Sequence, residues 1–116
     1  MEAGEVVFAP FIQTDGGKKV RPGLVVETWV NGMGQAMVRL AYGTSKVERH
    51  SATDFVIGPE DGPAFRSAGL RVATKFRFDQ FVSAPESACK RIGALNEQAL
   101  RKAFVAFENA RKEGCV

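Results

Sequence analysis

A chain of 116 residues can bury one hydrophobic core but not two, so we expect a single domain over residues 1–116. With 45% hydrophobic and 25% charged residues, the composition excludes an intrinsically disordered protein. The net charge of +3 is small and spread along the chain, so by itself it does not indicate an anionic partner. Only a local cluster of basic residues would do so.

The sequence carries no visible export or membrane signal. No apolar run approaches the roughly 20 residues that a membrane span needs, and the acidic first five residues lack the basic segment of a secretory signal. Cys89 and Cys115 form no metal-type pair. We therefore expect a cytoplasmic protein in which both cysteines are reduced thiols.

The first half of the chain predicts short strands joined by turns. Residues 5–9 are rich in β-forming side chains, and we expect this strand to close at Pro10, before a polar turn over residues 14–17. Residues 24–30 predict a second strand. The sequence Asn31-Gly32, with Gly34 close behind, is typical of a hairpin turn.

Two further strands follow, separated by a loop over residues 43–53. Residues 37–42 alternate, with Val38, Leu40 and Tyr42 on one face and Met37, Arg39 and Ala41 on the other. Residues 54–57 predict a shorter strand, and the glycines and prolines of residues 58–63 interrupt the chain.

Residues 70–78 show the clearest strand pattern in the chain. One predicted face carries Leu70, Val72, Thr74, Phe76 and Phe78, and the other carries Arg71, Ala73, Lys75 and Arg77. The three cations of the second face could follow the phosphates of a single-stranded nucleic acid. The alternative is that they form the solvated side of a sheet.

The end of the chain predicts an edge strand over residues 91–95 and then a helix. Asn96 can cap the helix, and Gly114 lies near its end. Leu100, Phe104 and Phe107 share one helix face, which either packs on the core or in part contacts a second subunit. Short strands followed by one helix predict a small, mainly β barrel, with an open α+β sandwich as the alternative.

A basic cluster precedes the second strand. Lys18, Lys19 and Arg21 follow a glycine-rich turn, and Pro22 favours an extended Arg21 at the rim of the sheet. An arginine in that position can bind phosphate through two hydrogen bonds. The alternative is an ordinary solvated loop.

Several motifs, in order and spacing, resemble the MazF/PemK family of toxins. They are the Gly-Glu-Val-Val of residues 4–7, the Val-Arg-Pro-Gly-Leu-Val-Val of residues 20–26, the Gly-Thr-Ser of residues 43–45, residues 67–79, and the Arg-Ile-Gly-Ala-Leu of residues 91–95. Each motif is weak by itself. Together they span nearly the whole chain.

The resemblance implies an SH3-like barrel of five to seven strands that forms a homodimer. It also implies a toxin of a type II toxin–antitoxin system, a sequence-selective endoribonuclease (mRNA interferase) that uses no metal or other cofactor. Cleavage of single-stranded RNA would proceed by attack of the 2′-OH, and the acidic, disordered segment of an antitoxin would block the basic groove.

Site roles follow from the same resemblance. Arg21 would stabilise the phosphate, since its ordinary pKa makes it a poor proton donor, and Thr44 would hold the scissile phosphate. The remaining RNA contacts would come from Lys18, Lys19, Ser45, Arg71, Lys75 and Arg77.

The resemblance does not assign the general base. Some family members carry an arginine and a carboxylate two residues apart on the late strand, and here Arg71 is followed by Ala73 at the carboxylate position. His50 is the candidate proton carrier instead, unless it is simply an exposed loop histidine. For Asp79 we expect a turn-capping role.

Two other functions remain open. Ala73 favours a catalytically silent SH3-like barrel that binds nucleic acid or a protein partner, whereas Arg21 together with Thr44 favours the nuclease. The other open function is that of a structural protein of a mobile element or phage.

Overall fold

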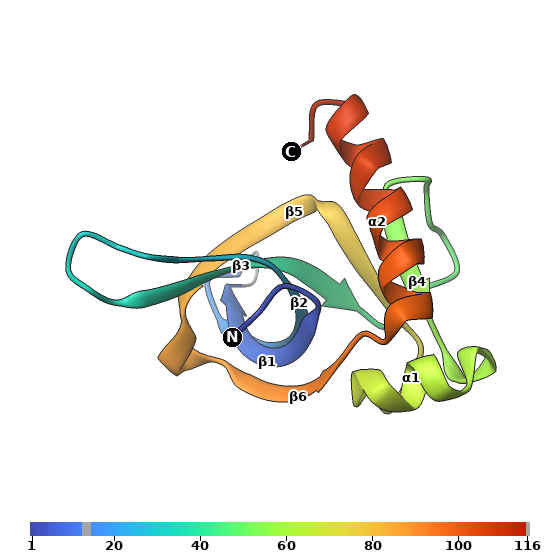
Figure 1. Ribbon diagram of the computed structural model, residues 1–116, viewed down its shortest axis with the longest axis horizontal. Coiled ribbons are helices and arrows are strands. Elements are labelled where there is room, and N and C mark those ends of the chain that lie inside the picture. Colours follow the sequence, from blue (N-terminus) through green and yellow to red (C-terminus); the bar gives the residue numbers. More distant parts are fainter. Residues whose placement is uncertain (13–14, 116) are drawn as a thin grey trace.

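The computed structural model describes residues 1–12 and 15–115. Within them, six strands form one antiparallel sheet in the order β4-β5-β3-β2-β1-β6. The sheet curls into a half-barrel, and the C-terminal helix α2 stands against its open side (Figure 1). The elements are β1 (Glu5–Ile12), β2 (Lys18–Val30), β3 (Ala36–Thr44), β4 (Asp54–Ile57), η1 (Pro59–Asp61), α1 (Pro63–Ala68), β5 (Thr74–Pro85), η2 (Glu86–Ala88), β6 (Lys90–Ala94) and α2 (Glu97–Lys112).

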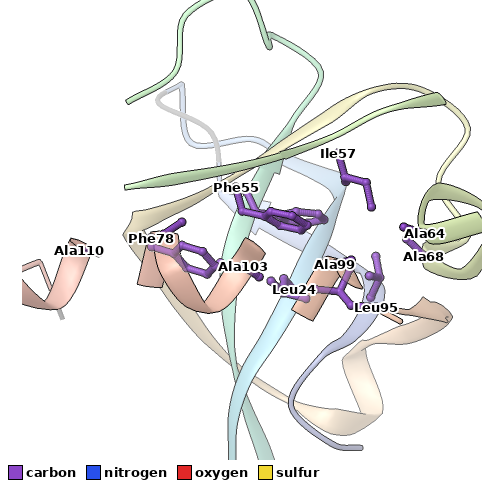
Figure 2. Packing of buried hydrophobic residues seen from close by; sticks show 14 residues of the cluster. Leu24, Phe55, Ile57, Ala64, Ala68, Phe78, Leu95, Ala99, Ala103 and Ala110 are labelled. Atoms are coloured by element: carbon purple, nitrogen blue, oxygen red, sulfur yellow. The ribbon is translucent and has the colours of Figure 1, made fainter. Parts of the chain in front are cut away.

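Alternating side chains of the curled sheet form two hydrophobic clusters, one on each face. The first cluster lies between the sheet and the helices and contains Phe76 and Phe78, both essentially inaccessible to solvent (Figure 2). The second lies on the opposite face and contains Phe11, Val25 and Leu40. The predicted small barrel of short strands with a terminal helix is therefore confirmed.

The hairpin between β2 and β3 also confirms its prediction. The Asn31 N–H donates to the Gln35 carbonyl at 2.9 Å, and Val30 pairs with Ala36. The strand over residues 54–57 has the predicted bounds, and β6 begins one residue earlier than expected. Of the predicted polar turn, residue 14 lies outside the described residues.

Proline does not close β1, contrary to the prediction. The strand continues to Ile12, and Pro10 pairs with Val20 of β2. The pairing of β6 with β1 reaches only as far as Phe8, so Pro10 lies beyond that ladder. A proline at this position therefore interrupts no hydrogen bond between β1 and β6.

The predicted strand over residues 70–78 is wrong at both ends. Residues 70–73 lie outside any strand, with bends at residues 71 and 72, and β5 begins at Thr74, whose Oγ1 donates to the Val72 carbonyl at 3.0 Å. The strand then continues to Pro85. Arg71 therefore lies before the strand, and the predicted row of three cations on β5 is reduced to Lys75 and Arg77.

Helix α1 directly follows the predicted chain break. Pro63 occupies the first turn of this helix, where its missing N–H has no intrahelical partner. With six residues, α1 is too short to show an amphipathic period in the sequence.

Helix α2 begins as predicted, and of the three apolar side chains on its predicted face Phe107 packs against the core, edge-on to Phe78 with ring centroids 5.7 Å apart. Asn96 caps the helix by accepting a hydrogen bond from the Ala99 N–H at 3.0 Å. Leu100 and Phe104, expected on the core face, are 43% and 62% exposed. The buried face consists of small side chains: Ala99, Ala103, Ala106 and Ala110.

Two glycines allow α1 to lie against β6. Gly69 ends α1 with a φ of +73°, and a Cβ placed there would lie 1.9 Å from the Ile92 carbonyl oxygen. A Cβ at Gly93 would lie 2.4 Å from the Ala68 carbonyl. Two of the sequence motifs, residues 67–79 and 91–95, thus form one close backbone contact.

Gly69→Ala should lower the free energy of unfolding by about 3 kcal/mol or more, since it combines left-handed backbone strain with a main-chain clash. Gly34→Ala is the matched control, because Gly34 has a φ of +76° with nothing within 4 Å of the added Cβ. That variant should lose only about 1 kcal/mol. Equal losses in urea denaturation would contradict the packing argument.

Candidate functional site

Arg21 lies inside β2, near its start, and Thr44 is the last residue of β3. The prediction that the basic cluster precedes the second strand is wrong, because β2 begins at Lys18 and pairs with β1 from there on. Gly23 pairs with Tyr42, and continuing this register by two residues puts Arg21 opposite Thr44. The strands touch here, because a Cβ on Gly43 would lie 2.6 Å from the Pro22 carbonyl oxygen. The structure therefore brings together the two residues that the sequence motifs singled out.

The Arg21 side chain is half-buried against the second cluster. It shares a face of β2 with Val25 and lies across from Ala9 of β1. Among the described residues, its Nε atom is buried without a hydrogen-bond partner. An unsatisfied buried donor of this kind is uncommon in folded proteins, and it belongs to a guanidinium, the group best suited to bind phosphate through two hydrogen bonds.

The Thr44 hydroxyl is oriented by the chain that follows it. Its Oγ1 accepts a hydrogen bond from the Lys46 N–H at 3.2 Å. Because Oγ1 is the acceptor in this contact, its hydroxyl hydrogen can still be donated to a phosphate oxygen.

Strand β5 adds two cations beside Thr44. Lys75 pairs with Thr44, and Arg77 pairs with Tyr42, so the four side chains share one face of the sheet. Lys75 Nζ also donates to the Arg49 carbonyl at 2.6 Å, which ties the loop after β3 to the same face. Arg21, Thr44 and Lys75 thus form a row of side chains across three adjacent strands.

A bulge in β5 brings a carboxylate to this face. Tyr42 pairs with Arg77 and Ala41 pairs with Phe81, so residues 78–80 have no partner in β3. Bulges turn side chains away from the regular alternation of a strand. Within this bulge Asp79 accepts two hydrogen bonds from Arg77, at 3.2 Å from Nε and 2.9 Å from the terminal nitrogen.

Asp79 therefore pairs with an arginine inside β5, and its expected role as a turn cap is wrong. Arg77-Phe78-Asp79 has the arginine-x-carboxylate spacing that the family resemblance places at Arg71 and Ala73. The spacing is visible in the sequence, but a strand expected from residue 70 puts it six residues too early.

A cleft of about 860 Å³ adjoins the row. Lys18, Tyr42, Arg77 and Asp79 line it, and Phe11 packs edge-on against Tyr42 with ring centroids 5.2 Å apart. Two cations, one carboxylate and an aromatic wall give the cleft the groups that a single-stranded nucleic acid requires, namely phosphate ligands and a surface for bases.

The remaining predicted site residues are exposed on the surface. Lys19, Ser45 and His50 are exposed, and His50 Nδ1 lies 3.4 Å from the Val47 carbonyl. Their roles stay predictions. Arg71, outside β5 and exposed, is not part of the row.

The described residues contain no group of three or more His, Cys, Asp or Glu side chains arranged to hold a metal ion. Both cysteines are free, and burial, followed by the charge of Glu86, raises the pKa of the Cys89 thiol. No helix in the described part of the chain is long and apolar enough to cross a membrane.

No model of a protein family matches the sequence, and no curated protein matches it. Solved structures do resemble the fold. The Mycobacterium tuberculosis toxin MazF-mt6 is 23% identical with a TM-score of 0.66, covering 93% of this chain and 96% of that chain.

Two further structures are solved with their antitoxins. An endoribonuclease from a mycobacterial species in complex with its cognate antitoxin is 18% identical, with a TM-score of 0.64 and coverage of 95% of this chain and 93% of that chain. MazE–MazF from Deinococcus radiodurans is 16% identical, with a TM-score of 0.65 and coverage of 97% and 96%. At such identities the likeness establishes the fold.

Proposed function

We propose that this chain, which has the fold of the MazF toxins, is the endoribonuclease toxin of a type II toxin–antitoxin system. It cleaves single-stranded RNA by attack of the 2′-OH, without a metal or other cofactor, and selects its cleavage sequence. The observation that carries this proposal is the alignment of Arg21, Thr44 and Lys75 on three strands beside the Arg77–Asp79 pair.

The row supplies charge where the reaction develops it. As the 2′-oxygen bonds to phosphorus, negative charge builds on the phosphoryl oxygens, and the guanidinium of Arg21 with the Thr44 hydroxyl can bind them. The P–O5′ bond then breaks. The products are a 2′,3′-cyclic phosphate and a 5′-hydroxyl.

Asp79 is the proposed acceptor of the 2′-OH proton. In the structure both carboxylate oxygens of Asp79 accept hydrogen bonds from Arg77, and an RNA phosphate that competes for this arginine would leave the carboxylate available to take the proton. His50 is our candidate for returning a proton to the 5′-oxygen, because Lys75 holds the neighbouring Arg49 carbonyl and so anchors its loop. Lys18, Lys19 and Ser45 are proposed RNA contacts.

The partners follow from the same proposal. A cognate antitoxin, with an acidic segment that competes with RNA for the cleft, would inhibit the toxin. The chain would act as one domain, as a homodimer and in the cytoplasm. The catalytically silent barrel loses its main support, because Ala73 lies outside β5 and no longer marks the carboxylate position.

A gel assay on long single-stranded RNA tests the proposal. With a chelator present, the purified chain should still give discrete fragments, and pre-incubation with the antitoxin should suppress them. Fragments that disappear with the chelator would refute the metal-independent reaction. Retarded but intact RNA would instead support the silent barrel.

A further inference from the structure

Tyr42 presents an aromatic ring to the cleft beside the row of Arg21, Thr44 and Lys75. It is half-buried, lines the cleft, and shares its face of β3 with Thr44. The two residues are two positions apart, which is about 7 Å along a strand. One ribose spans a comparable distance between a phosphate and its base, so a phosphate held at Thr44 brings a base of the same strand within reach of Tyr42.

Phe11 fixes the orientation of this ring. It is buried in the second cluster, against which Tyr42 also packs. The two rings meet edge-on, with an angle of 89° between their planes, and such a contact covers at most one face of the Tyr42 ring. Among the described residues, the cation that lies over a ring is Arg39, and its ring is Phe81. One face of a preorganised ring is therefore left for a ligand.

The part of the cleft next to Tyr42 suits a base better than a phosphate. Val82 pairs with Leu40, two residues before Tyr42 on the same face, and Ala84 comes two residues after Val82. Both side chains line the cleft together with Phe11. A phosphate at these apolar side chains would lose its hydration without gaining a partner, whereas the flat face of a base would leave water at little cost.

We infer that Tyr42 is a base-stacking residue, which holds a nucleotide next to the scissile phosphate by contact with its base. The phosphates then follow the row and Arg77, and this base turns toward Tyr42 and Val82. The ring selects a base over a bare backbone without reading its hydrogen-bonding groups, because every base has a π-face. The inference rests on the proposed function, since it requires RNA in the cleft.

Two probes distinguish a contact with a base from a contact with the backbone. The first is a single-stranded RNA oligomer of mixed sequence, methylated on its 2′-oxygens so that 2′-OH attack cannot cut it. The second is the same sugar–phosphate chain without bases. Fluorescence anisotropy at one salt concentration measures both affinities. Tyr42→Leu should bind the first probe about tenfold more weakly, within the range for one stacked base, and the second probe as the wild type does.

Three further variants are controls for this result. Tyr42→Phe keeps the ring and should bind both probes like the wild type. Trp29→Leu removes a ring from a partly exposed strand position outside the cleft and should do the same. Lys75→Ala removes a proposed phosphate ligand and should weaken the binding of both probes by a similar factor. Because leucine keeps an apolar side chain against Phe11, the circular dichroism spectrum of Tyr42→Leu should match that of the wild type.

Four results would overturn the inference. They are a wild-type chain that binds neither probe, a Tyr42→Leu variant that binds like the wild type, a loss in Tyr42→Leu that is equal for both probes, and a Tyr42→Phe variant that binds as weakly as Tyr42→Leu.

Cleavage of long RNA, measured on the same samples, separates this inference from the nuclease. A loss confined to the probe with bases, in a chain that leaves long RNA intact, supports the stacking contact and refutes the proposed activity. A wild-type chain that cuts RNA, with a Tyr42→Leu variant that binds and cuts equally well, supports the activity and overturns the stacking contact.

Discussion

Replacing Arg21 by alanine is expected to lower the rate of RNA cleavage by about 10²–10³-fold, the usual loss when one preorganised donor to a developing negative charge is removed. The side chain lies opposite Thr44, and its buried Nε lacks a partner among the described residues. Initial rates of fragment formation on a labelled single-stranded RNA provide the measurement.

Two further variants show whether the guanidinium itself is needed. Arg21→Lys keeps the charge but loses the planar pair of donors, so it should recover only a small part of the activity. Arg66→Ala removes an equal charge from the exposed surface of α1 and should cleave like the wild type. If Arg21→Ala and Arg66→Ala cleave equally well, Arg21 is not part of the site.

Asp79→Asn is expected to lower the cleavage rate by about 10²–10⁴-fold, the range for loss of a general base. Asparagine preserves the shape of the side chain but cannot take the 2′-OH proton. RNA affinity should be retained or increase, because Arg77 no longer has a carboxylate partner and one negative charge has left the cleft. Single-turnover rates together with filter binding measure both quantities.

Glu27→Gln is the matched control for Asp79→Asn. It also removes a carboxylate that pairs with an arginine in the sheet, Arg39 at 3.8 Å, but it does so away from the cleft. Each pair is partly exposed, so neither change should cost more than about 1 kcal/mol of stability. An Asp79→Asn variant as active as Glu27→Gln would remove Asp79 from the reaction.

Local signals explain which parts of the fold the sequence could predict. Asn31-Gly32 specifies a hairpin turn, Asn96 caps α2, and the alternation from Thr74 to Phe78 marks the inward face of β5. Each depends on neighbouring residues only. The closeness of Arg21 and Thr44 has a similar origin, because their motifs lie near the start of β2 and at the end of β3, which are adjacent strands.

Other features depend on contacts between distant segments. The pattern of residues 70–78 conceals a strand that starts at Thr74, because Gly69 must remain free to approach β6. The bulge at residues 78–80, which turns Asp79 toward Arg77, is set by the pairing of β3 with β5. Nor could the alanine face of α2 be predicted, since apolar periodicity favoured Leu100 and Phe104.

The chemistry of the fragment ends tests the central claim most directly. RNA cut by the wild-type chain in the presence of a chelator should carry 2′,3′-cyclic phosphate and 5′-hydroxyl ends, and a 2′-deoxy residue at the cleavage position should prevent cutting there. Fragments with 5′-phosphate ends, or cleavage that continues through the 2′-deoxy position, would contradict attack by the 2′-OH and with it the proposed roles of Arg21, Thr44 and Asp79.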